Sequence, residues 1–246
     1  MVRVWIDTDG GDNPDDAIAL LLAAAHPGID LVGISTVGGD VVMRAHLARD
    51  LLESVGAPVP LVYAGAPDPR ALNSAEAVLA IGPLTNLSAL MRAGGTLPPT
   101  VVMGGVFEPT LHRGGVRESE SNFTSDALAA AVVVANAADL LLVPLDVTAA
   151  MVAGPAECQQ FETIPRLGDS IIAWRLQGHA LCLHDPLAVL ALVGEHVQVG
   201  RRAIAVTVEG RSVVDAHAGT EHDVVVGADH AAATRRIVDL VMTWGD

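Results

Sequence analysis

The chain has 246 residues, with 29 acidic side chains, 14 basic ones and a formal net charge of -15. All of the basic side chains are arginine, so Schiff-base chemistry, pyridoxal phosphate attachment and the phosphate-loop lysine are excluded. The strong negative charge, without any basic stripe, excludes binding to a nucleic-acid polymer. With 51% hydrophobic residues the chain can bury a sizeable core, and we predict a single domain over residues 1–246.

Apolar segments in this sequence are short. None approaches the roughly 20 residues of a membrane-spanning helix, and the N-terminus lacks the basic start and apolar run of a signal peptide. We therefore expect a cytoplasmic protein without a membrane partner. Cys158 and Cys182 form no metal-type spacing, and we interpret them as reduced core residues rather than a disulfide.

The first 17 residues combine a short apolar strand with a cluster of aspartates. Val2 to Ile6 reads as a strand, and five of residues 7 to 16 are aspartates. Close repulsion among carboxylates is costly unless a cation or a hydrogen-bond network compensates for it. An oxygen-only ligand set favours a hard ion, so this stretch predicts a site for Ca²⁺ or Mg²⁺.

The first third of the chain then alternates between strands and helices. An apolar helix follows at residues 17–25, a strand at 29–37, a helix at 41–55 and a strand at 60–64. Such alternation predicts a parallel, doubly wound sheet with right-handed crossovers.

The remainder continues this pattern and then becomes less regular. We predict strands at 78–81, 100–103 and 140–145, helices from 86 to about 93 and from 125 to about 137, and a long polar loop at 106–124. Residues 155–183 predict two helices, which His184-Asp185-Pro186 interrupts before a helical segment at 187–193. Three antiparallel strands (203–208, 212–215 and 223–226) and a closing helix at 229–244 complete the chain.

Polar junctions follow several of the predicted parallel strands. In an open parallel sheet the carboxyl ends of the strands face one crevice, where ligands bind. We therefore expect five segments to converge there: residues 9–16, 38–40, 82–86, 103–105 and 146–148.

An ordered set of motifs along the chain resembles the inosine–uridine-type nucleoside hydrolases. In chain order they are Asp7-Thr8-Asp9-Gly10-Gly11-Asp12-Asn13-Pro14-Asp15-Asp16-Ala17, Ser35-Thr36-Val37-Gly38-Gly39-Asp40, Gly82-Pro83-Leu84-Thr85-Asn86, Met103-Gly104-Gly105, Glu120-Ser121-Asn122-Phe123, His184-Asp185-Pro186 and Gly210-Arg211-Ser212-Val213-Val214-Asp215. Each motif alone is weak or moderate, but the ordered set spans nearly the whole chain. With the alternation above, the resemblance implies an α/β fold with a Rossmann-like open, mostly parallel sheet, helices on both faces and a small antiparallel C-terminal addition.

The resemblance also implies a metal and a catalytic base. One Ca²⁺ would be held by Asp9, Asp16, the main-chain carbonyl of Thr85 and Asp185, and the ribose 2′- and 3′-hydroxyls and a water would complete its shell. Asp9 would also act as the general base on that water. This ligand chemistry suits calcium.

Substrate contacts follow from the same resemblance. Asp15 would hydrogen-bond a ribose hydroxyl, Glu120 and Asn122 would hold the far side of the sugar, and Met103 would line the pocket. The leaving base departs more readily when it is protonated or hydrogen-bonded, and His184 is the candidate donor because histidine titrates near neutrality.

Two departures from the family pattern concern the substrate. Asp40 stands where many members have asparagine and would add a negative charge beside the ribose. Only residues 65–75 occupy an interval in which members commonly carry an extra, pocket-covering segment. We read His112, Arg113 and Arg117 as residues of a solvated loop, with contact to a base or a phosphate as the alternative.

These features support one leading function and two rivals. The leading function is a calcium-dependent hydrolysis of the N-glycosidic bond of a ribonucleoside or related riboside, which gives ribose and a free base. The alternative is a non-catalytic or repurposed ribose- or nucleoside-binding protein. A phosphatase of the haloacid-dehalogenase type, suggested by Asp7-Thr8-Asp9-Gly10, is disfavoured by the absence of lysine. The composition is compatible with a homo-oligomer, a dimer or a tetramer.

Overall fold

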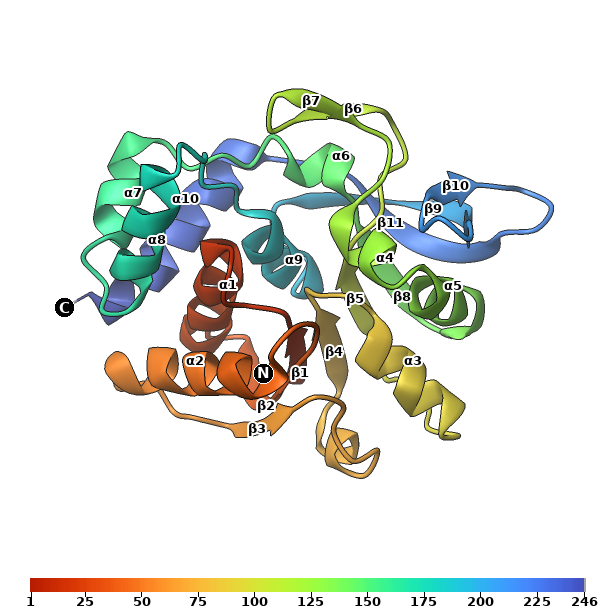
Figure 1. Ribbon diagram of the computed structural model, residues 1–246, viewed down its shortest axis with the longest axis horizontal. Helices are drawn as coiled ribbons and strands as arrows, with labels where there is room; N and C mark the ends of the chain where they lie inside the picture. Colours follow the sequence, from red (N-terminus) through yellow and green to blue (C-terminus); the bar gives the residue numbers. More distant parts are fainter. Residues whose placement is uncertain (246) are drawn as a thin grey trace.

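The computed structural model describes residues 1–245, which form a central sheet flanked by helices (Figure 1). Nine strands hydrogen-bond in the order β10-β9-β11-β8-β5-β4-β1-β2-β3. Their bounds are β1 (Val2–Thr8), β2 (Ile29–Thr36), β3 (Leu61–Ala64), β4 (Ala77–Ala80), β5 (Thr100–Met103), β8 (Leu140–Val143), β9 (Val197–Val206), β10 (Ser212–Val214) and β11 (Thr220–Ala228). All neighbouring pairs are parallel except β10–β9 and β9–β11, so β9 alone of these nine strands runs in the opposite direction. The predicted α/β fold class is therefore confirmed.

Helices cover both faces of this sheet, and shorter elements connect them. The α-helices are α1 (Pro14–Ala25), α2 (Val41–Ser54), α3 (Thr85–Arg92), α4 (Ser121–Ser125), α5 (Ala127–Asn136), α6 (Leu145–Thr148), α7 (Pro155–Phe161), α8 (Leu167–Leu176), α9 (His184–Leu192) and α10 (His230–Val241). Two 3₁₀ turns, η1 (Ala71–Ser74) and η2 (Met242–Trp244), and a hairpin of β6 (Thr110–His112) and β7 (Gly115–Arg117) complete the described elements. No helix within residues 1–245 is long and apolar enough to cross a membrane.

The core lies in two layers because side chains alternate along each strand. In β1, Val4 and Ile6 join the layer packed beneath α1, α2 and α7 to α10, whereas Trp5 joins the layer beneath α3 and α5. In β4, Leu79 joins the same layer as Val4 and Ile6, and Val78 joins the same layer as Trp5. Strands buried on both faces explain the continuous apolar runs in the sequence.

The strand order reverses direction beside β1, and this reversal locates the crevice. From β1 the chain builds outward through β2 and β3 on one side, and then returns to add β4, β5 and β8 on the other. Ligands of open parallel sheets bind outside the carboxyl ends of the strands at such a switch point. The aspartate-rich loop after β1 and the Gly82-Pro83 turn after β4 therefore meet at the expected crevice.

Three predicted segments differ in detail from the structure. The polar stretch 106–124 contains the β6–β7 hairpin and α4. His184-Asp185-Pro186 opens α9 instead of interrupting a helix, since proline is favoured in a first helical turn. Of the three late strands, β9 and β10 form the antiparallel addition, while β11 also pairs in parallel with β8 and so extends the main sheet.

Trp5 determines how β1 fits against β2. Its side chain is buried, its Nε1 donates to Ser35 Oγ at 2.9 Å, and it faces Gly33 across the strand pair. A Cβ at Gly33 would lie 2.1 Å from Trp5 Cζ3. Only glycine therefore leaves room for the indole ring at this register.

We expect Gly33→Ala to lower the free energy of unfolding by about 2 kcal/mol or more, because the new methyl group overlaps a buried ring. Urea unfolding followed by circular dichroism measures the change. Gly115→Ala is the control, because a Cβ there meets no atom within 4 Å. Equal unfolding free energies for the two variants would contradict this account of the β1–β2 register.

Candidate active site

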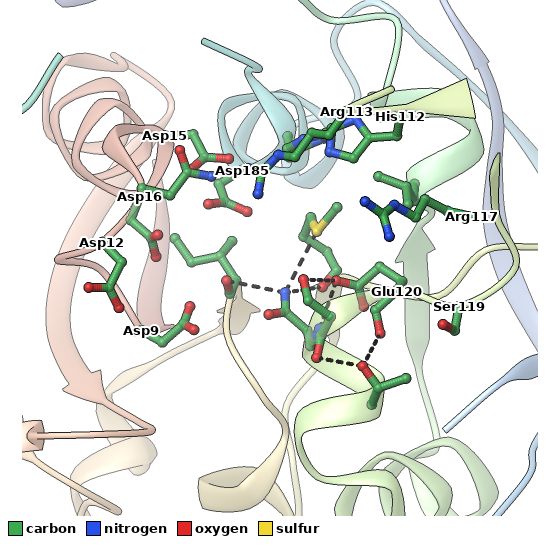
Figure 2. Close-up of a pocket in the computed structure, with 18 of the residues that line it drawn as sticks. Asp9, Asp12, Asp15, Asp16, His112, Arg113, Arg117, Ser119, Glu120 and Asp185 are labelled. Carbon is green, nitrogen blue, oxygen red and sulfur yellow. Dashed lines mark hydrogen bonds between the residues drawn. The ribbon is translucent and has the colours of Figure 1, made fainter. Parts of the chain in front are cut away.

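A cavity of about 430 Å³ opens at the carboxyl edge of the sheet, a volume within the range of ligand sites. Figure 2 shows Asp9, Asp12, Asp15 and Asp16 on one side of it and Arg117, Ser119 and Glu120 on the other, with Asp185 between. The hairpin residues His112 and Arg113 lie along its rim (Figure 2). The junctions after β1, β4 and β5 thus converge, as expected, and the start of α9 joins them. The other two expected segments, residues 38–40 and 146–148, do not line the cavity.

Three buried carboxylates form the centre of the site. Asp15 and Asp16 stand in the first turn of α1, Asp185 stands in the first turn of α9, and each offers an oxygen within 4.8 Å of the others. All three are at most 5% exposed, and Asp15 Oδ1 has no hydrogen-bond partner among the described residues. An oxygen-only donor set with an orphaned buried carboxylate oxygen fits a hard cation such as Ca²⁺.

Burial makes the ionised form of these groups costly. Desolvation raises the pKa of Asp15 to about 7, and desolvation together with the neighbouring carboxylates raises the pKa of Asp16 and Asp185 well above 3.8. A bound cation would reverse this effect by favouring the ionised forms. The three carboxylates can therefore hold a metal at neutral pH, and they repel one another without it.

Asp9 lies beside this cluster at the end of β1. It lines the same cavity, and its charge acts on Asp15, Asp16 and Asp185. Burial raises the pKa of Asp9 to about 6, while the charge of Arg44 opposes that rise. A Cβ at Gly82 would lie 2.9 Å from Asp9 N, so the glycine allows close approach of these two strand ends.

Behind the aspartate loop, Asp7 is fully buried and anchors the strand ends. Its Oδ1 accepts from Ser35 Oγ and, at 2.8 Å, from Asn86 Nδ2. Asn86 Nδ2 also donates to Thr36 O at 3.0 Å. Asp7 is therefore a support for the cavity floor rather than a lining residue, and Asn86 ties the turn after β4 to β1 and β2.

Asn122 forms part of the opposite wall together with Met103. The Asn122 side chain is 8% exposed, and its Nδ2 donates to Met103 O at 3.0 Å and to Ile81 O at 3.4 Å. Both amide hydrogens are used in this way, so Oδ1 is the group that can meet a ligand. The structure thus places the two predicted contacts Asn122 and Met103 at the cavity.

Glu120 also lines the cavity, but its carboxylate caps α4. It accepts from the backbone N–H groups of Gly105, Asn122 and Phe123 and from the Ser121 hydroxyl, at distances from 2.7 to 3.2 Å. An ionised carboxylate has about four acceptor positions, and these four bonds occupy them. Glu120 therefore orients Asn122, and little acceptor capacity is left for a sugar.

Two predicted site residues lie outside the residues that line the cavity. Asp40 is exposed and caps α2, where its Oδ1 accepts from Val42 N and Met43 N. Thr85 is exposed as well, and its hydroxyl donates to Asp126 Oδ2 at 2.7 Å. In contrast, Ile81, which directly precedes Gly82-Pro83, lines the cavity.

His184 is buried in the cavity wall. Its Nδ1 lies 2.9 Å from Thr148 Oγ1, and its ring meets the ring of His112 edge-on at a centroid distance of 5.0 Å. Burial lowers the pKa of His184 to about 3, and the neighbouring His112 and Arg113 add to this effect. The imidazole is therefore neutral at pH 7, and it can donate an N–H hydrogen bond but is not a charged acid.

The β6–β7 hairpin contributes residues whose role the sequence left open. His112, Arg113 and Arg117 all line the cavity instead of pointing away into solvent. The guanidinium of Arg113 lies over the Trp174 ring of α8 at 5.1 Å, which holds the tip of the hairpin across the cavity. Trp174 lines the cavity too, and nothing in its local sequence indicates this.

Comparison with known proteins gives the family. The profile described as "Inosine-uridine preferring nucleoside hydrolase" matches residues 4–78 and 72–235. The probable uridine nucleosidase 2 of Oryza sativa subsp. japonica is 25% identical over 87% of this chain and 80% of its own. That alignment, of 275 positions, is longer than the part of this chain that it covers, so the rice protein has segments that this chain lacks.

Two further proteins agree with this match. The pyrimidine-specific ribonucleoside hydrolase RihB of Escherichia coli is 29% identical over 62% of each chain. The solved structure of a purine-preferring ribonucleoside hydrolase from Gardnerella vaginalis has the same fold, with a TM-score of 0.81, 21% identity and 99% coverage of both chains. The chain therefore belongs to the family of inosine-uridine preferring nucleoside hydrolases, which are N-ribohydrolases.

Proposed function

We propose that this protein hydrolyses the N-glycosidic bond of a ribonucleoside or related riboside in a calcium-dependent reaction, giving ribose and a free base. The observation that carries the proposal is the buried group Asp15, Asp16 and Asp185 at the cavity of a nucleoside hydrolase family member. Three carboxylates at this density need a cation, and their oxygen chemistry favours Ca²⁺.

The metal would be held by Asp9, Asp16 and Asp185 together with one main-chain carbonyl. We assign that carbonyl to Ile81 instead of Thr85, because Ile81 lines the cavity and Thr85 does not. The Ile81 oxygen already accepts from Asn122, and its second lone pair remains available. When bound, the ion supplies positive charge that attracts hydroxyl groups and makes a neighbouring water more acidic.

The sugar would be held between the two walls of the cavity. Asp15, whose Oδ1 has no partner, accepts a hydrogen bond from one ribose hydroxyl. On the other wall Asn122 offers its Oδ1 and Met103 offers an apolar surface. Glu120 keeps Asn122 in place and acts as a positioning residue.

Cleavage of the glycosidic bond develops positive charge on the ribose ring. The carboxylate-rich wall stabilises this charge, and Asp9, with a pKa of about 6, accepts a proton from the attacking water. Because His184 is neutral at pH 7, it assists the departing base as a hydrogen-bond donor. Arg113 and Arg117 line the cavity and lie close enough to meet the base or a substituent on it.

A calcium-supplemented screen of diverse ribosides tests the proposal. Purified protein is incubated with purine, pyrimidine and modified ribosides, and mass spectrometry detects ribose and free base. Release of ribose that stops on chelation supports the proposal. Calcium-dependent binding of ribosides by calorimetry, without any ribose released, would instead support the non-catalytic binding protein.

Asp9→Asn should lower kcat on the best riboside by about 10²- to 10⁴-fold, because the amide cannot take a proton from water. Steady-state kinetics with saturating calcium measure the change. Asp50→Asn is the matched control, because Asp50 is exposed on α2 and does not line the cavity. Loss of activity in the control, or full activity in Asp9→Asn, would argue against Asp9 as the base.

Asp185→Asn should weaken calcium binding by at least about tenfold, because it removes a charged ligand from the buried cluster. Isothermal titration calorimetry gives the dissociation constant. Asp40→Asn serves as the control, since asparagine retains the cap of α2 and residue 40 does not line the cavity. Equal affinities for the two variants would rule out Asp185 as a ligand.

The stabilisation by calcium should grow as pH rises from about 5 to about 8. The folded-state pKa values of Asp7, Asp9 and Asp15 lie at about 7, 6 and 7, above the unfolded value of 3.8. These groups therefore stabilise the calcium-free fold at low pH, and that contribution is lost as pH rises through the folded pKa values. Thermal unfolding at about pH 5 and about pH 8 measures the difference in Tm between protein with calcium and protein with a chelator. The same Tm difference at both pH values would contradict the prediction.

A further inference from the structure

A second group of metal-ligating side chains lies beside the acidic cluster. His112, Cys182 and His184 each offer a ligand atom, and these three atoms lie within 4.8 Å of one another. Cys182 and His184 are buried, and His112 is half-buried. Among these residues, only His184 has a part in the proposed reaction.

Three structural elements bring these residues together. His112 ends β6, Cys182 forms an isolated antiparallel bridge with Val152, and His184 is the first residue of α9. The edge-on contact between the two imidazole rings already holds the hairpin against the cavity wall. The group therefore links the two-stranded hairpin to the start of a core helix.

The kinds of ligand atom distinguish this group from the acidic cluster beside it. Asp15, Asp16 and Asp185 offer only oxygen, which suits a hard ion, whereas one thiolate and two imidazoles suit Zn²⁺ and similar softer ions. We propose that His112, Cys182 and His184 form a binding site for zinc or a chemically similar divalent cation, distinct from the calcium site.

The distances allow such a site with a small adjustment. Zinc lies about 2.3 Å from sulfur and about 2.0 to 2.1 Å from nitrogen, so tetrahedral ligand atoms are roughly 3.5 Å apart. Closing from at most 4.8 Å needs a movement of about 1 Å. His112, on the half-exposed hairpin, can supply that movement, and three protein ligands leave a fourth position open to the cavity.

Neighbouring groups already hold the two imidazole rings in place, and the His112 ring meets the His184 ring edge-on. Thr148 holds the Nδ1 of His184 and fixes the orientation of the ring, as outer partners do in metal sites. Burial raises the pKa of the Cys182 thiol, so binding of each ion releases that proton to solvent.

The surrounding charges act in both directions. Arg113 follows His112 and repels a cation, as does Arg117, while the negative charge of Asp15 reaches Cys182 and attracts one. Asp185 is adjacent in sequence to His184. A calcium ion on the acidic cluster would remove part of the attraction, so we expect calcium to weaken zinc binding modestly without competing for the same ligands.

Zinc binding would stop the proposed reaction. This inhibition rests on the proposed function, whereas the zinc site itself does not. An ion on His184 occupies the side chain that assists the departing base. It also fastens His112 to the wall and so holds the hairpin over the cavity. The site would therefore act as an inhibitory one, responsive to zinc rather than to substrate.

Cobalt(II) is the direct probe of the site, because a cysteine thiolate on cobalt gives a charge-transfer band in the near ultraviolet. Under reducing conditions, one equivalent of Co²⁺ should produce this band in the wild-type protein, and excess Zn²⁺ should remove it. Cys182→Ser should abolish the band and weaken zinc binding by at least about 100-fold. Cys158→Ser is the matched control, because it changes the other free, buried cysteine, and it should keep the band.

His112→Ala gives a second test on a residue outside the core, and it should weaken zinc binding while far-ultraviolet circular dichroism stays unchanged. In activity assays, Zn²⁺ should inhibit the wild type and Cys158→Ser, and Cys182→Ser should resist inhibition. No band in the wild type, or a band that survives in Cys182→Ser, would overturn the proposal. A Cys182-dependent band in a protein that hydrolyses no riboside would leave the zinc site standing and reject the proposed function.

Discussion

The cost of burying Asp15, Asp16 and Asp185 together is the constraint on which the rest of the structure depends. Each carboxylate is held by the first turn of a core helix, so none can move into solvent without disrupting α1 or α9. The helix N-termini lower this cost through their dipoles, but the raised pKa values show that they do not remove it. The fold thus concentrates negative charge at one point, and a bound cation would balance it.

Other polar side chains around the cavity serve to hold backbone groups in place. Asp7 ties Ser35 and Asn86 to the end of β1, and Glu120 gathers the N–H groups of three backbone positions. Buried networks of this kind fix one arrangement because an unpaired member is costly. These networks hold two sides of the cavity, and the hairpin that carries His112 closes a third side through ring contacts with His184 and Trp174.

The sequence predicted the alternating elements and the edge at which they converge, because apolar runs and polar junctions are local signals. It placed Asp9, Asp15 and Asp16 near one another for the same reason, whereas Asp185 was expected beside them only from the family resemblance. The choice of Thr85 as a ligand was harder to make, since a motif identifies a turn but not which of its residues faces the cavity. Ile81 lines the cavity and Thr85 does not.

The hairpin and the capping residues were missed for related physical reasons. Strands β6 and β7 have three residues each and are polar, so they carry too little periodicity to be recognised, and Arg113 adopts a positive φ of 49° that its residue type does not indicate. Asp40 and Glu120 were expected beside the sugar from the family resemblance, and the sequence did not indicate that each carboxylate caps a helix. Only the direction of each side chain distinguishes the two roles.

Both amide hydrogens of Asn122 are already used in hydrogen bonds, and this limits which sugars the pocket accepts. With Met103 O and Ile81 O taking the donors, the residue faces the cavity as a pure acceptor. A furanose that lacks the hydroxyl opposite it would leave a desolvated oxygen without a partner, a penalty of about 1 to 3 kcal/mol. The pocket would then select against sugars that lack a hydroxyl at that position, without any contact to the base.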